Sequence, residues 1–291
     1  MPPGRHGEKM TGFAERYGPW AIVAGASDGV GAAFARAMAE RGLNVVLLAR
    51  RQGLLDEVAA GIRAETGVET LAVAVDLADE GAMSVVAAAT DGLDVGMLIY
   101  CAGADPNYEP FLDLPIDDAL TMVRRNCVVP MQMCHHFATP MRTRGKGGIV
   151  LLSSGAGLVG ASNMVAYAAT KAFDMVMAEA LWAELHGGGV DVLGLVLGLT
   201  DTPALRQLLA KRGVLRSADD PAPIPGAATA GEVVADALAN LQNGPTWFVG
   251  EQLRQGSMQL GSIPRSDAVR MMVQQGAATM NPSTPVQEES H

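Results

Sequence analysis

The amino-acid sequence predicts a single α/β domain with a doubly wound parallel sheet of seven strands, in the order 3-2-1-4-5-6-7. Three observations predict this fold. Short apolar runs alternate with segments of helical length from residue 20 onward. These runs lack polar alternation, as expected of strands whose two faces are both covered by helices. The first run leads into a glycine-rich turn and then a helix, which is the order of a parallel βα unit.

The strands are expected where the apolar runs occur. The seven runs are residues 20–25, 44–49, 70–75, 95–101, 149–153, 190–196 and 246–249. Segments of helical length separate them, for example residues 31–41 and 54–66. Because parallel neighbours need a crossover between them, this alternation predicts helices on both faces of the sheet.

The chain shows no internal repeat and no linker, and its 291 residues suit one α/β domain. We expect an N-terminal arm at residues 1–15, the folded domain at 16–279 and a flexible tail at 280–291. The segment from about 199 to 230 breaks the rhythm of strands and helices. Its charged helical piece, 204–216, and the proline-rich stretch that follows predict an inserted substrate loop over a site.

Composition narrows the partners and the compartment. The formal net charge is −10 and no basic run offsets it, which argues against nucleic acid as a partner. No apolar stretch approaches the roughly 18 residues of a membrane span, and residues 1–9 do not begin a signal peptide. The cysteines Cys101, Cys127 and Cys134 have no paired spacing. We therefore expect a cytoplasmic protein that acts on a small molecule.

The turn after the first strand predicts a phosphate-binding loop. Gly25 and Gly29 allow the backbone to turn, Gly31 allows close helix packing, and the helix N-terminus offers N–H groups to an anion. The alternative is a plain βα turn without a ligand. The residues expected to contact a dinucleotide here are Gly25, Ser27, Asp28, Gly29, Val30 and Gly31.

The end of the second strand predicts which dinucleotide is bound. Folds that prefer NAD usually carry an acid there for the ribose 2′-hydroxyl, whereas this chain has Ala49 followed by Arg50 and Arg51. Two guanidinium groups suit a 2′-phosphate, so NADP(H) is the preferred cofactor, with NAD(H) as the alternative. The other interpretation of Arg50 and Arg51 is two solvated arginines.

A tyrosine and a lysine four residues apart predict an acid/base site. Tyr167 and Lys171 lie in a helical segment, so their side chains share one face. A phenol is a poor acid or base at neutral pH, and a nearby ammonium favours its phenolate form. Ser154 ends the preceding strand, where its hydroxyl can reach a substrate carbonyl oxygen. Asn126 lies in the helical segment before that strand.

These residues together resemble the short-chain dehydrogenase/reductase family, a Rossmann-type fold, from about residue 20 to 249. The glycine turn, Asp76, Asn126, Ser154 and Tyr167-x-x-x-Lys171 occur in the family's order and at its spacings. The resemblance implies Tyr167 as general acid/base and Ser154 as its partner on the substrate oxygen. It further implies that Lys171 binds the nicotinamide ribose, that Asn126 holds a relay water and that Asp76 contacts the adenine. The other cofactor contacts that it implies are Leu77, Ala102, Gly103, Gly198, Thr200 and Thr202.

Two further segments look like one branch of that family. The opening Tyr17-Gly18-Pro19-Trp20-Ala21 and the run 44–50 are similar to 17β-hydroxysteroid dehydrogenases and very-long-chain 3-oxoacyl-CoA reductases. The likeness implies interconversion of a ketone and a secondary alcohol on a largely apolar, steroid-like or fatty-acyl-like substrate. It also implies a homodimer or homotetramer, with the helices that carry Asn126 and Tyr167 at the interface. Apolar residues that can line the substrate pocket are Leu158, Val159 and Met164, for which plain packing is the alternative. The leucines of the inserted segment that can close over such a ligand are Leu205, Leu208, Leu209 and Leu215.

The chain also departs from the family pattern. Ala24 replaces a threonine before the first glycine, Tyr100-Cys101 replaces a pair of asparagines after the fourth strand, and Leu197-Gly198 replaces Pro-Gly after the sixth. Two other functions stay open, a non-enzymatic NADP(H) sensor and an NAD-linked alcohol dehydrogenase working in the oxidative direction. No metal site is expected, because neighbouring helical residues such as His135 and His136 point about 100° apart. These histidines are expected in the core or at an interface.

Overall fold

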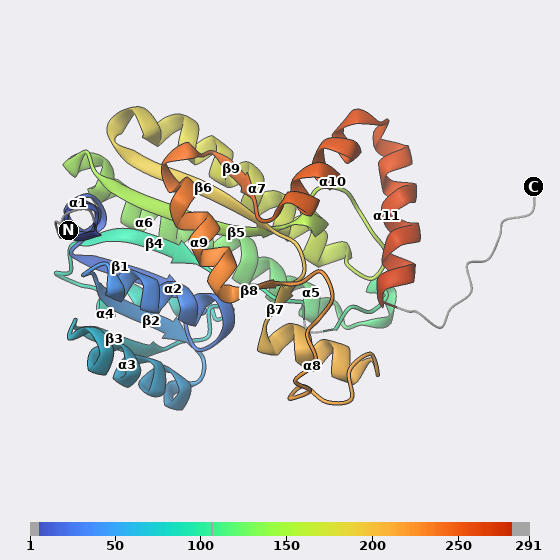
Figure 1. The fold of residues 1–291 in the computed structure, drawn as a ribbon, viewed down its shortest axis with the longest axis horizontal. Helices are drawn as coiled ribbons and strands as arrows, with labels where there is room; N and C mark the ends of the chain where they lie inside the picture. The colour runs from blue at the N-terminus through green and yellow to red at the C-terminus, as the bar shows by residue number, and fades with distance from the viewer. Residues whose placement is uncertain (1–5, 106, 281–291) are drawn as a thin grey trace, which may run out of the picture.

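Seven parallel strands form the central sheet of the computed structural model, which describes residues 6–105 and 107–280 (Figure 1). The predicted strand order is confirmed, with the ninth strand of the chain as the seventh in the sheet. In spatial order the strands are β3 (Thr70–Ala74), β2 (Asn44–Ala49), β1 (Trp20–Ala24), β4 (Val95–Tyr100), β5 (Gly147–Ser154), β6 (Val190–Leu197) and β9 (Thr246–Phe248).

The strand order reverses at β1, which pairs with β2 on one side and β4 on the other. Ala24, the last residue of β1, lies opposite Leu48 of β2 and Tyr100 of β4. The segments that follow these strands therefore leave the sheet at one edge. In open α/β sheets this reversal opens a crevice beyond the carboxyl ends of the strands, where ligands bind.

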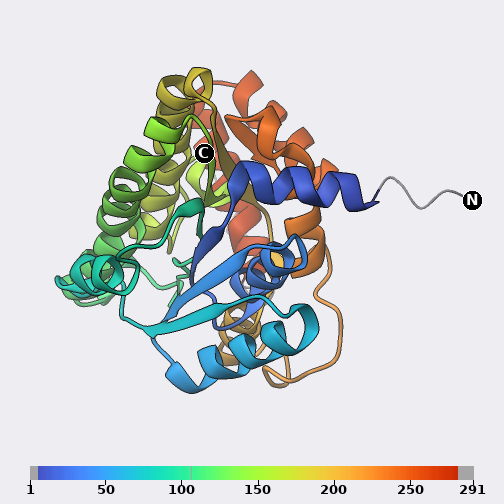
Figure 2. The ribbon, with the colours of Figure 1, turned by 90° about the vertical axis from the view of Figure 1, so that its left-hand side faces the viewer.

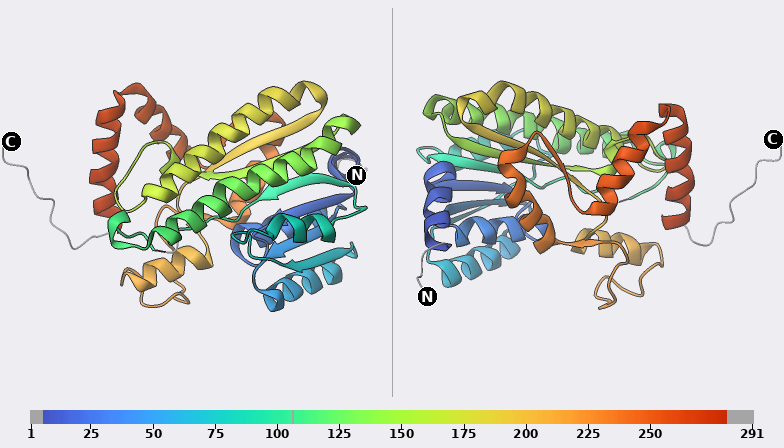
Figure 3. Two further views of the ribbon diagram at one scale, coloured as in Figure 1. Left: turned by 180° about the vertical axis from the view of Figure 1, so that it is seen from behind. Right: turned by 45° about the horizontal axis from the view of Figure 1, so that its top comes forward.

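Helices cover both faces of the sheet, and Figures 1 and 2 show the sheet between the two layers. One layer contains α2 (Gly29–Glu40), α3 (Gln52–Thr66) and α9 (Ala230–Asn240). The other contains α4 (Ala82–Ala89), α6 (Val129–Arg144) and α7 (Val165–Leu185), which face the viewer in the left view of Figure 3. Successive strand residues point to opposite faces of the sheet. In β1, for example, Val23 packs against the layer of α2, α3 and α9, and Ile22 against the layer of α4, α6 and α7.

Short helices complete the chain before the last strand. They are η1 (Phe111–Asp113), α5 (Ile116–Val123), the π-helix η2 (Arg124–Val128), η3 (Gly155–Gly157), η4 (His186–Gly188) and η5 (Leu241–Asn243). The π-helix joins α5 to α6, so one long helical path runs from residue 116 to 144. Single π-helical turns of this kind often mark functional positions.

The N-terminal segment forms a helix, α1 (His6–Tyr17), that is joined to the sheet. The Tyr17 hydroxyl donates a hydrogen bond of 2.6 Å to Asp191 in β6. The Arg16 guanidinium donates to both oxygens of the same carboxylate, at 2.7 and 2.9 Å. Tyr17 is buried, so α1 ends inside the fold.

The predicted loop at 199–230 carries structure of its own. It contains the short strands β7 (Thr200–Asp201) and β8 (Ala228–Thr229), which pair in parallel, and the helix α8 (Pro203–Lys211). The helix was predicted to reach residue 216, and this is wrong beyond Lys211. Gly213 adopts a φ of +72°, a left-handed conformation that turns the chain out of the helix.

Two helices follow the last strand, α10 (Glu251–Ser262) and α11 (Arg265–Met280), which project from one side of the fold in Figure 1. The sequence argument did not predict them. The expected tail at 280–291 lies outside the described residues except for Met280, which ends α11. Within residues 6–105 and 107–280, no helix combines the length and the apolar character needed to cross a membrane.

Candidate active site

The glycine turn joins β1 to α2 at the carboxyl edge of the sheet. Gly25 and Gly29 have φ values of +82° and +52°. A Cβ on Gly31 would lie 2.0 Å from the carbonyl oxygen of Gly25, so only glycine lets the helix begin this close to the strand. The N–H groups of the first helical turn are left for a ligand. The turn that Gly25 to Gly31 form therefore fits the predicted pyrophosphate.

Arg51 lies beside the glycine turn. Its guanidinium forms an ion pair with Asp28 and donates to Ser27 Oγ at 3.2 Å. Arg50 is exposed at the end of β2. After β3, Asp76 Oδ1 accepts a hydrogen bond of 2.9 Å from the Ala78 N–H, while Leu77 is buried. The two guanidinium groups at this corner can offer charge-assisted hydrogen bonds to a 2′-phosphate.

The residues after β4 and β6 lie close to the same turn. A Cβ on Gly25 would come within 2.9 Å of the Ala102 backbone nitrogen, and one on Gly29 within 3.3 Å of Thr202 Cγ2. Thr202 Oγ1 also accepts a hydrogen bond of 3.2 Å from the Leu205 N–H, which caps α8. Thr200 instead donates to the carbonyl oxygen of Gly198 at 3.3 Å. The structure thus brings Ala102 and Thr202 to the glycine turn.

Ser154 and the Tyr167 helix are joined through the end of β5. Ser153 Oγ donates a hydrogen bond of 2.7 Å to the Lys171 carbonyl oxygen, which fixes the strand against α7. Ser154, the next residue, begins η3 by accepting from the Ala156 N–H at 3.3 Å. Tyr167 and Lys171 are one turn apart on α7, as their spacing predicts.

Asn126 is held in the π-helix and is fully buried. Its Nδ2 donates to Thr170 Oγ1 at 3.0 Å, and Thr170 Oγ1 donates to the Tyr167 carbonyl oxygen at 2.9 Å. From the end of β4, the Tyr100 hydroxyl donates to the carbonyl oxygen of Arg125 at 2.5 Å. Tyr100 therefore braces the turn that carries Asn126, at a position where the family usually has asparagine.

The Lys171 ammonium is buried beside Asn126. Its Nζ donates to the Leu152 carbonyl oxygen at 2.8 Å and to Asp174 Oδ2 at 2.9 Å. A Cβ on Gly103 would lie 3.2 Å from Nζ and 2.8 Å from Asn126 Oδ1, so the Gly103 backbone passes directly over both groups. The structure therefore brings Gly103, Asn126 and Lys171 together.

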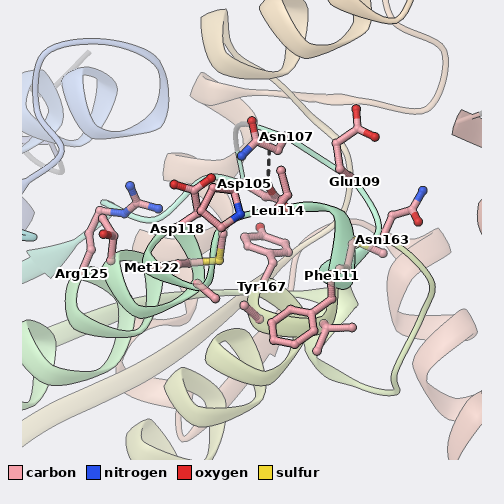
Figure 4. A pocket seen from close by; sticks show the side chains of 16 residues that line it. Asp105, Asn107, Glu109, Phe111, Leu114, Asp118, Met122, Arg125, Asn163 and Tyr167 are labelled. Carbon is pink, nitrogen blue, oxygen red and sulfur yellow. Dashed lines mark hydrogen bonds between the residues drawn. The ribbon is translucent and has the colours of Figure 1, made fainter.

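Tyr167 lines a cavity between α5, the loop before it and the start of α7. Figure 4 shows its ring among the side chains that surround this cavity. The apolar ones include Phe111, Leu114, Met122, Met164 and Val165, and the acidic ones are Asp105, Glu109 and Asp118. The cavity therefore has an apolar wall and several carboxylates around the candidate acid/base.

Arg125 is the cation among the cavity's described lining residues. It donates to the Ala104 carbonyl oxygen at 2.9 Å and to Asn126 Oδ1 at 3.2 Å. Burial lowers the pKa of this guanidinium, and the nearby Arg50 adds to the effect. Arg125 therefore lies both in the cavity wall and near Arg50, the residue that follows β2.

The residues expected to line the substrate pocket lie in different environments. Met164 lines the cavity, whereas Val159 is buried and the Leu158 carbonyl accepts a hydrogen bond of 3.1 Å from Arg265. In α8, Leu208 and Leu209 are also buried. Met164 is thus the one of these residues that lines the cavity.

The two arginines at the ends of α8 bond to nearby segments. Arg206 donates to both oxygens of Asp201 at 2.6 Å, and Arg212 donates to the Tyr108 carbonyl oxygen at 3.0 Å. Both guanidinium groups therefore hold loops of the fold in place.

The histidine pair and the cysteines lie outside this cavity. His135 and His136 are exposed on α6 rather than in the core, whereas Cys134 is buried there as a small apolar residue. Across the described residues, no group of three or more histidine, cysteine, aspartate or glutamate side chains is arranged to hold a metal ion.

Sequence reasoning missed four residues that organise the site: Tyr100, Arg125, Thr170 and Asp174. Two of them had a signal in the sequence. Thr170 lies three residues after Tyr167, and Asp174 three residues after Lys171, which are helical spacings that place side chains in contact. The contacts of Tyr100 and Arg125 join separate elements, so spacing does not indicate them.

Comparisons with known proteins agree with the fold. The sequence profile of the short chain dehydrogenase family matches residues 19–213. A 7beta-hydroxysteroid dehydrogenase of Collinsella aerofaciens is 37% identical over 191 residues, which cover 66% of this chain and 72% of that protein. The very-long-chain 3-oxoacyl-CoA reductase of Homo sapiens is 34% identical over 185 residues, or 62% of this chain and 59% of that protein.

A solved structure connects the fold with the same relatives. A structure solved in a study of 7beta-hydroxysteroid dehydrogenase stereoselectivity is similar to this chain, with a TM-score of 0.80 and 31% sequence identity. The match covers 89% of this chain and 98% of that one. The profile, the relatives and the strand order lead to one conclusion. This chain belongs to the short-chain dehydrogenase family and is an oxidoreductase that acts on CH–OH groups.

Proposed function

We propose that this protein is an NADP(H)-dependent oxidoreductase that interconverts a ketone and a secondary alcohol on a largely apolar substrate. One observation carries the proposal. Tyr167 borders a cavity while its own helical turn is hydrogen-bonded, through Thr170, to the buried Asn126, and Lys171 lies one turn further along the same helix. These contacts support the assignment of an acid/base, a cation and a buried amide to one site.

The roles follow from what each side chain can donate or accept. Tyr167 gives its phenolic proton to the carbonyl oxygen during reduction and takes it back during oxidation. Ser154 donates a hydrogen bond to the same oxygen and stabilises its developing charge. Lys171 binds the nicotinamide ribose, while Asn126 holds a relay water. The bound cofactor supplies or accepts the hydride.

The cofactor preference rests on charge at the end of β2. Arg50 and Arg51 follow β2, and Ala49 offers no carboxylate to a bare ribose. A 2′-phosphate gains charge-assisted hydrogen bonds from arginine that a hydroxyl does not. This supports NADP(H) over NAD(H).

The substrate class rests on the cavity and on the relatives. Phe111, Leu114 and Met122 offer an apolar wall beside Tyr167, which suits a steroid-like or fatty-acyl-like body. Asp105, Glu109 and Asp118 disfavour an anionic group inside the cavity. The names of the hydroxysteroid and 3-oxoacyl relatives indicate substrates with an apolar body of this kind. We therefore expect the part of the substrate inside the cavity, including the reacting ketone, to be uncharged.

One experiment tests both parts of the proposal. Steroid ketones, 3-oxoacyl thioesters and small sugars are assayed with NADPH, using the natural protein, Tyr167→Phe and Lys171→Ala. We expect the steroid ketones or the thioesters to give the highest kcat/KM. Tyr167→Phe should lower kcat by about 10²–10⁴-fold, because the phenolic proton is lost while cofactor contacts stay. Lys171→Ala should weaken both turnover and NADPH binding.

The matched control is Tyr108→Phe, which removes a phenolic hydroxyl from a loop residue whose ring packs under Arg212, 5.0 Å from the guanidinium carbon. Its kcat should stay close to that of the natural protein. A Tyr167→Phe protein that keeps most of its kcat would refute the acid/base assignment. The highest kcat/KM on sugars would refute the apolar substrate. NADPH binding without turnover on any carbonyl compound would favour the sensor function.

A further inference from the structure

Asp174 is a buried carboxylate to which the proposed reaction gives no role. It lies on α7 one turn after Lys171 and is 3% exposed. Its Oδ2 accepts the hydrogen bond of 2.9 Å from Lys171 Nζ. Its Oδ1 is buried and, within the described residues, has no hydrogen-bond partner. The carboxylate is therefore only half satisfied.

Three neighbouring elements surround Asp174 with titratable groups, namely Tyr100 of β4, Cys127 of η2 and Cys134 of α6. Burial, more than the charge of Asp174, raises the pKa of all three, so each is neutral at pH 7. Burial also raises the pKa of Asp174, against the opposing effect of Lys171. In the described part of the chain, Lys171 is the cation that Asp174 contacts.

Stability does not explain this carboxylate. A buried charge with one ion-pair partner loses its hydration and regains only part of that energy. An apolar residue opposite an apolar partner is often as stable as a buried ion pair, or more stable. A function for Asp174 follows more naturally from the group it touches.

The Lys171 ammonium has three N–H donors, and two of them are used inside the protein. The Leu152 carbonyl and Asp174 accept these two at 2.8 and 2.9 Å. The third N–H donor remains on the side of the Gly103 backbone. A Cβ on Gly103 would lie 3.2 Å from Lys171 Nζ. Two fixed acceptors thus determine the direction of the remaining donor.

We propose that Asp174 is a positioning residue that holds the Lys171 ammonium so that its remaining N–H is directed at the cofactor ribose. Asp174 acts only through Lys171 and touches neither substrate nor cofactor. The inference rests on the proposed role of Lys171 in cofactor binding.

A double-mutant cycle on cofactor binding tests this proposal. The Kd for NADPH is measured by fluorescence titration without substrate for Asp174→Val, Asp174→Asn, Lys171→Met and both double variants. Asp174→Val should raise Kd about tenfold. Asp174→Asn should raise it less, because an amide oxygen still accepts from Nζ. In the Lys171→Met background neither change should alter Kd further. In turnover, KM for NADPH should rise by a larger factor than kcat falls.

Glu179→Gln is the matched control. It removes a carboxylate from the same helix, where Glu179 accepts a hydrogen bond of 2.9 Å from Thr246, and should leave Kd unchanged. If Asp174→Val does not fold because Lys171 is left unpaired, the double variant with Lys171→Met should fold and recover the lost Tm. A double variant no more stable than the single one overturns the proposal.

The cycle separates this proposal from the function on which it rests. An effect of Asp174→Val on Kd that persists beside Lys171→Met overturns the positioning role, as does the absence of any effect. If Lys171→Met weakens binding and Asp174→Val does not, the positioning role alone fails. If Lys171→Met changes neither Kd nor kcat, the proposed function fails.

Discussion

Two adjacent arginines at the end of β2 have different surroundings, and this sets their expected weight in cofactor choice. Arg51 is already paired with Asp28 and bonded to Ser27, whereas Arg50 is exposed at the same edge of the sheet. A guanidinium that already holds a carboxylate gains less from a phosphate. Arg50 is therefore the main determinant that we expect, and Arg51 the secondary one.

Replacing Arg50 by alanine should lower the preference for NADP(H). A charge-assisted hydrogen bond contributes roughly 1.5–3 kcal/mol, which corresponds to about 10–150-fold in the ratio of kcat/KM for NADPH to that for NADH. Arg51→Ala is the comparison and should change the ratio less. Steady-state kinetics with both cofactors measure it. An unchanged ratio in Arg50→Ala would show that the preference has another origin.

Local spacing predicted the candidate catalytic residues and missed the residues that hold them. Tyr167 and Lys171 are four apart on one helix, and their proximity follows from helical geometry alone. The contact of Tyr100 with the Arg125 carbonyl joins β4 to a π-helix 25 residues later, and only tertiary packing creates it. Whether Asp174 contacts Lys171 or solvent likewise depends on what covers α7.

At the scale of elements, the strands were predicted closely because both of their faces are buried. Five of the seven sheet strands are largely or wholly buried in the structure, and continuous apolar runs mark such strands in a sequence. β9, at one edge of the sheet, is partly exposed. β3, at the sheet edge, is half-exposed and was predicted from the same kind of run. The two-residue strands β7 and β8 are too short to leave a pattern.

The helix α1 offers a test of how an element is attached to the sheet. The Tyr17 hydroxyl is buried against Asp191, and burial together with this hydrogen bond raises the pKa of Tyr17. Asp191→Ala leaves the hydroxyl without that acceptor. Because an unsatisfied buried group costs about 1–3 kcal/mol, the free energy of unfolding should fall by that amount. Urea denaturation measures the difference.

Arg16→Ala is the control for the attachment of α1. It removes the exposed partner of the same carboxylate, and exposed ion pairs contribute about 0–1 kcal/mol. Its effect should therefore be smaller than that of Asp191→Ala. Equal losses in the two variants would show that the ion pair, and not the buried hydroxyl, attaches the helix.

At the scale of the whole molecule, the reversal of strand order at β1 explains why distant residues share one site. The glycine turn after β1, the arginines after β2 and Ser154 at the end of β5 all lie at the carboxyl edge of the sheet. The sequence predicts this because parallel strands send their carboxyl ends to one side. It does not predict the cavity, whose walls come from α5 and from loops with no period of their own.

The exposed surfaces of α5, α6 and α7 lead to a prediction about the assembly of the protein. α6 and α7 run side by side over one layer of the fold (Figure 3). Each carries an exposed apolar side chain, Met131 at 49% and Val176 at 58%, and Leu120 of α5 is 57% exposed. We expect these helices to form the interface of a homodimer or homotetramer, in which such side chains become buried. Sedimentation velocity at micromolar concentration should then show an assembly larger than one chain.

Met131→Glu should shift this assembly toward the monomer, since a charge in the centre of an apolar interface is left without a partner. Met258→Glu makes the same change at an exposed residue of α10, 66% accessible, and should leave the assembly intact. A natural protein that sediments as a monomer, or equal dissociation by both variants, would place the interface elsewhere or remove it.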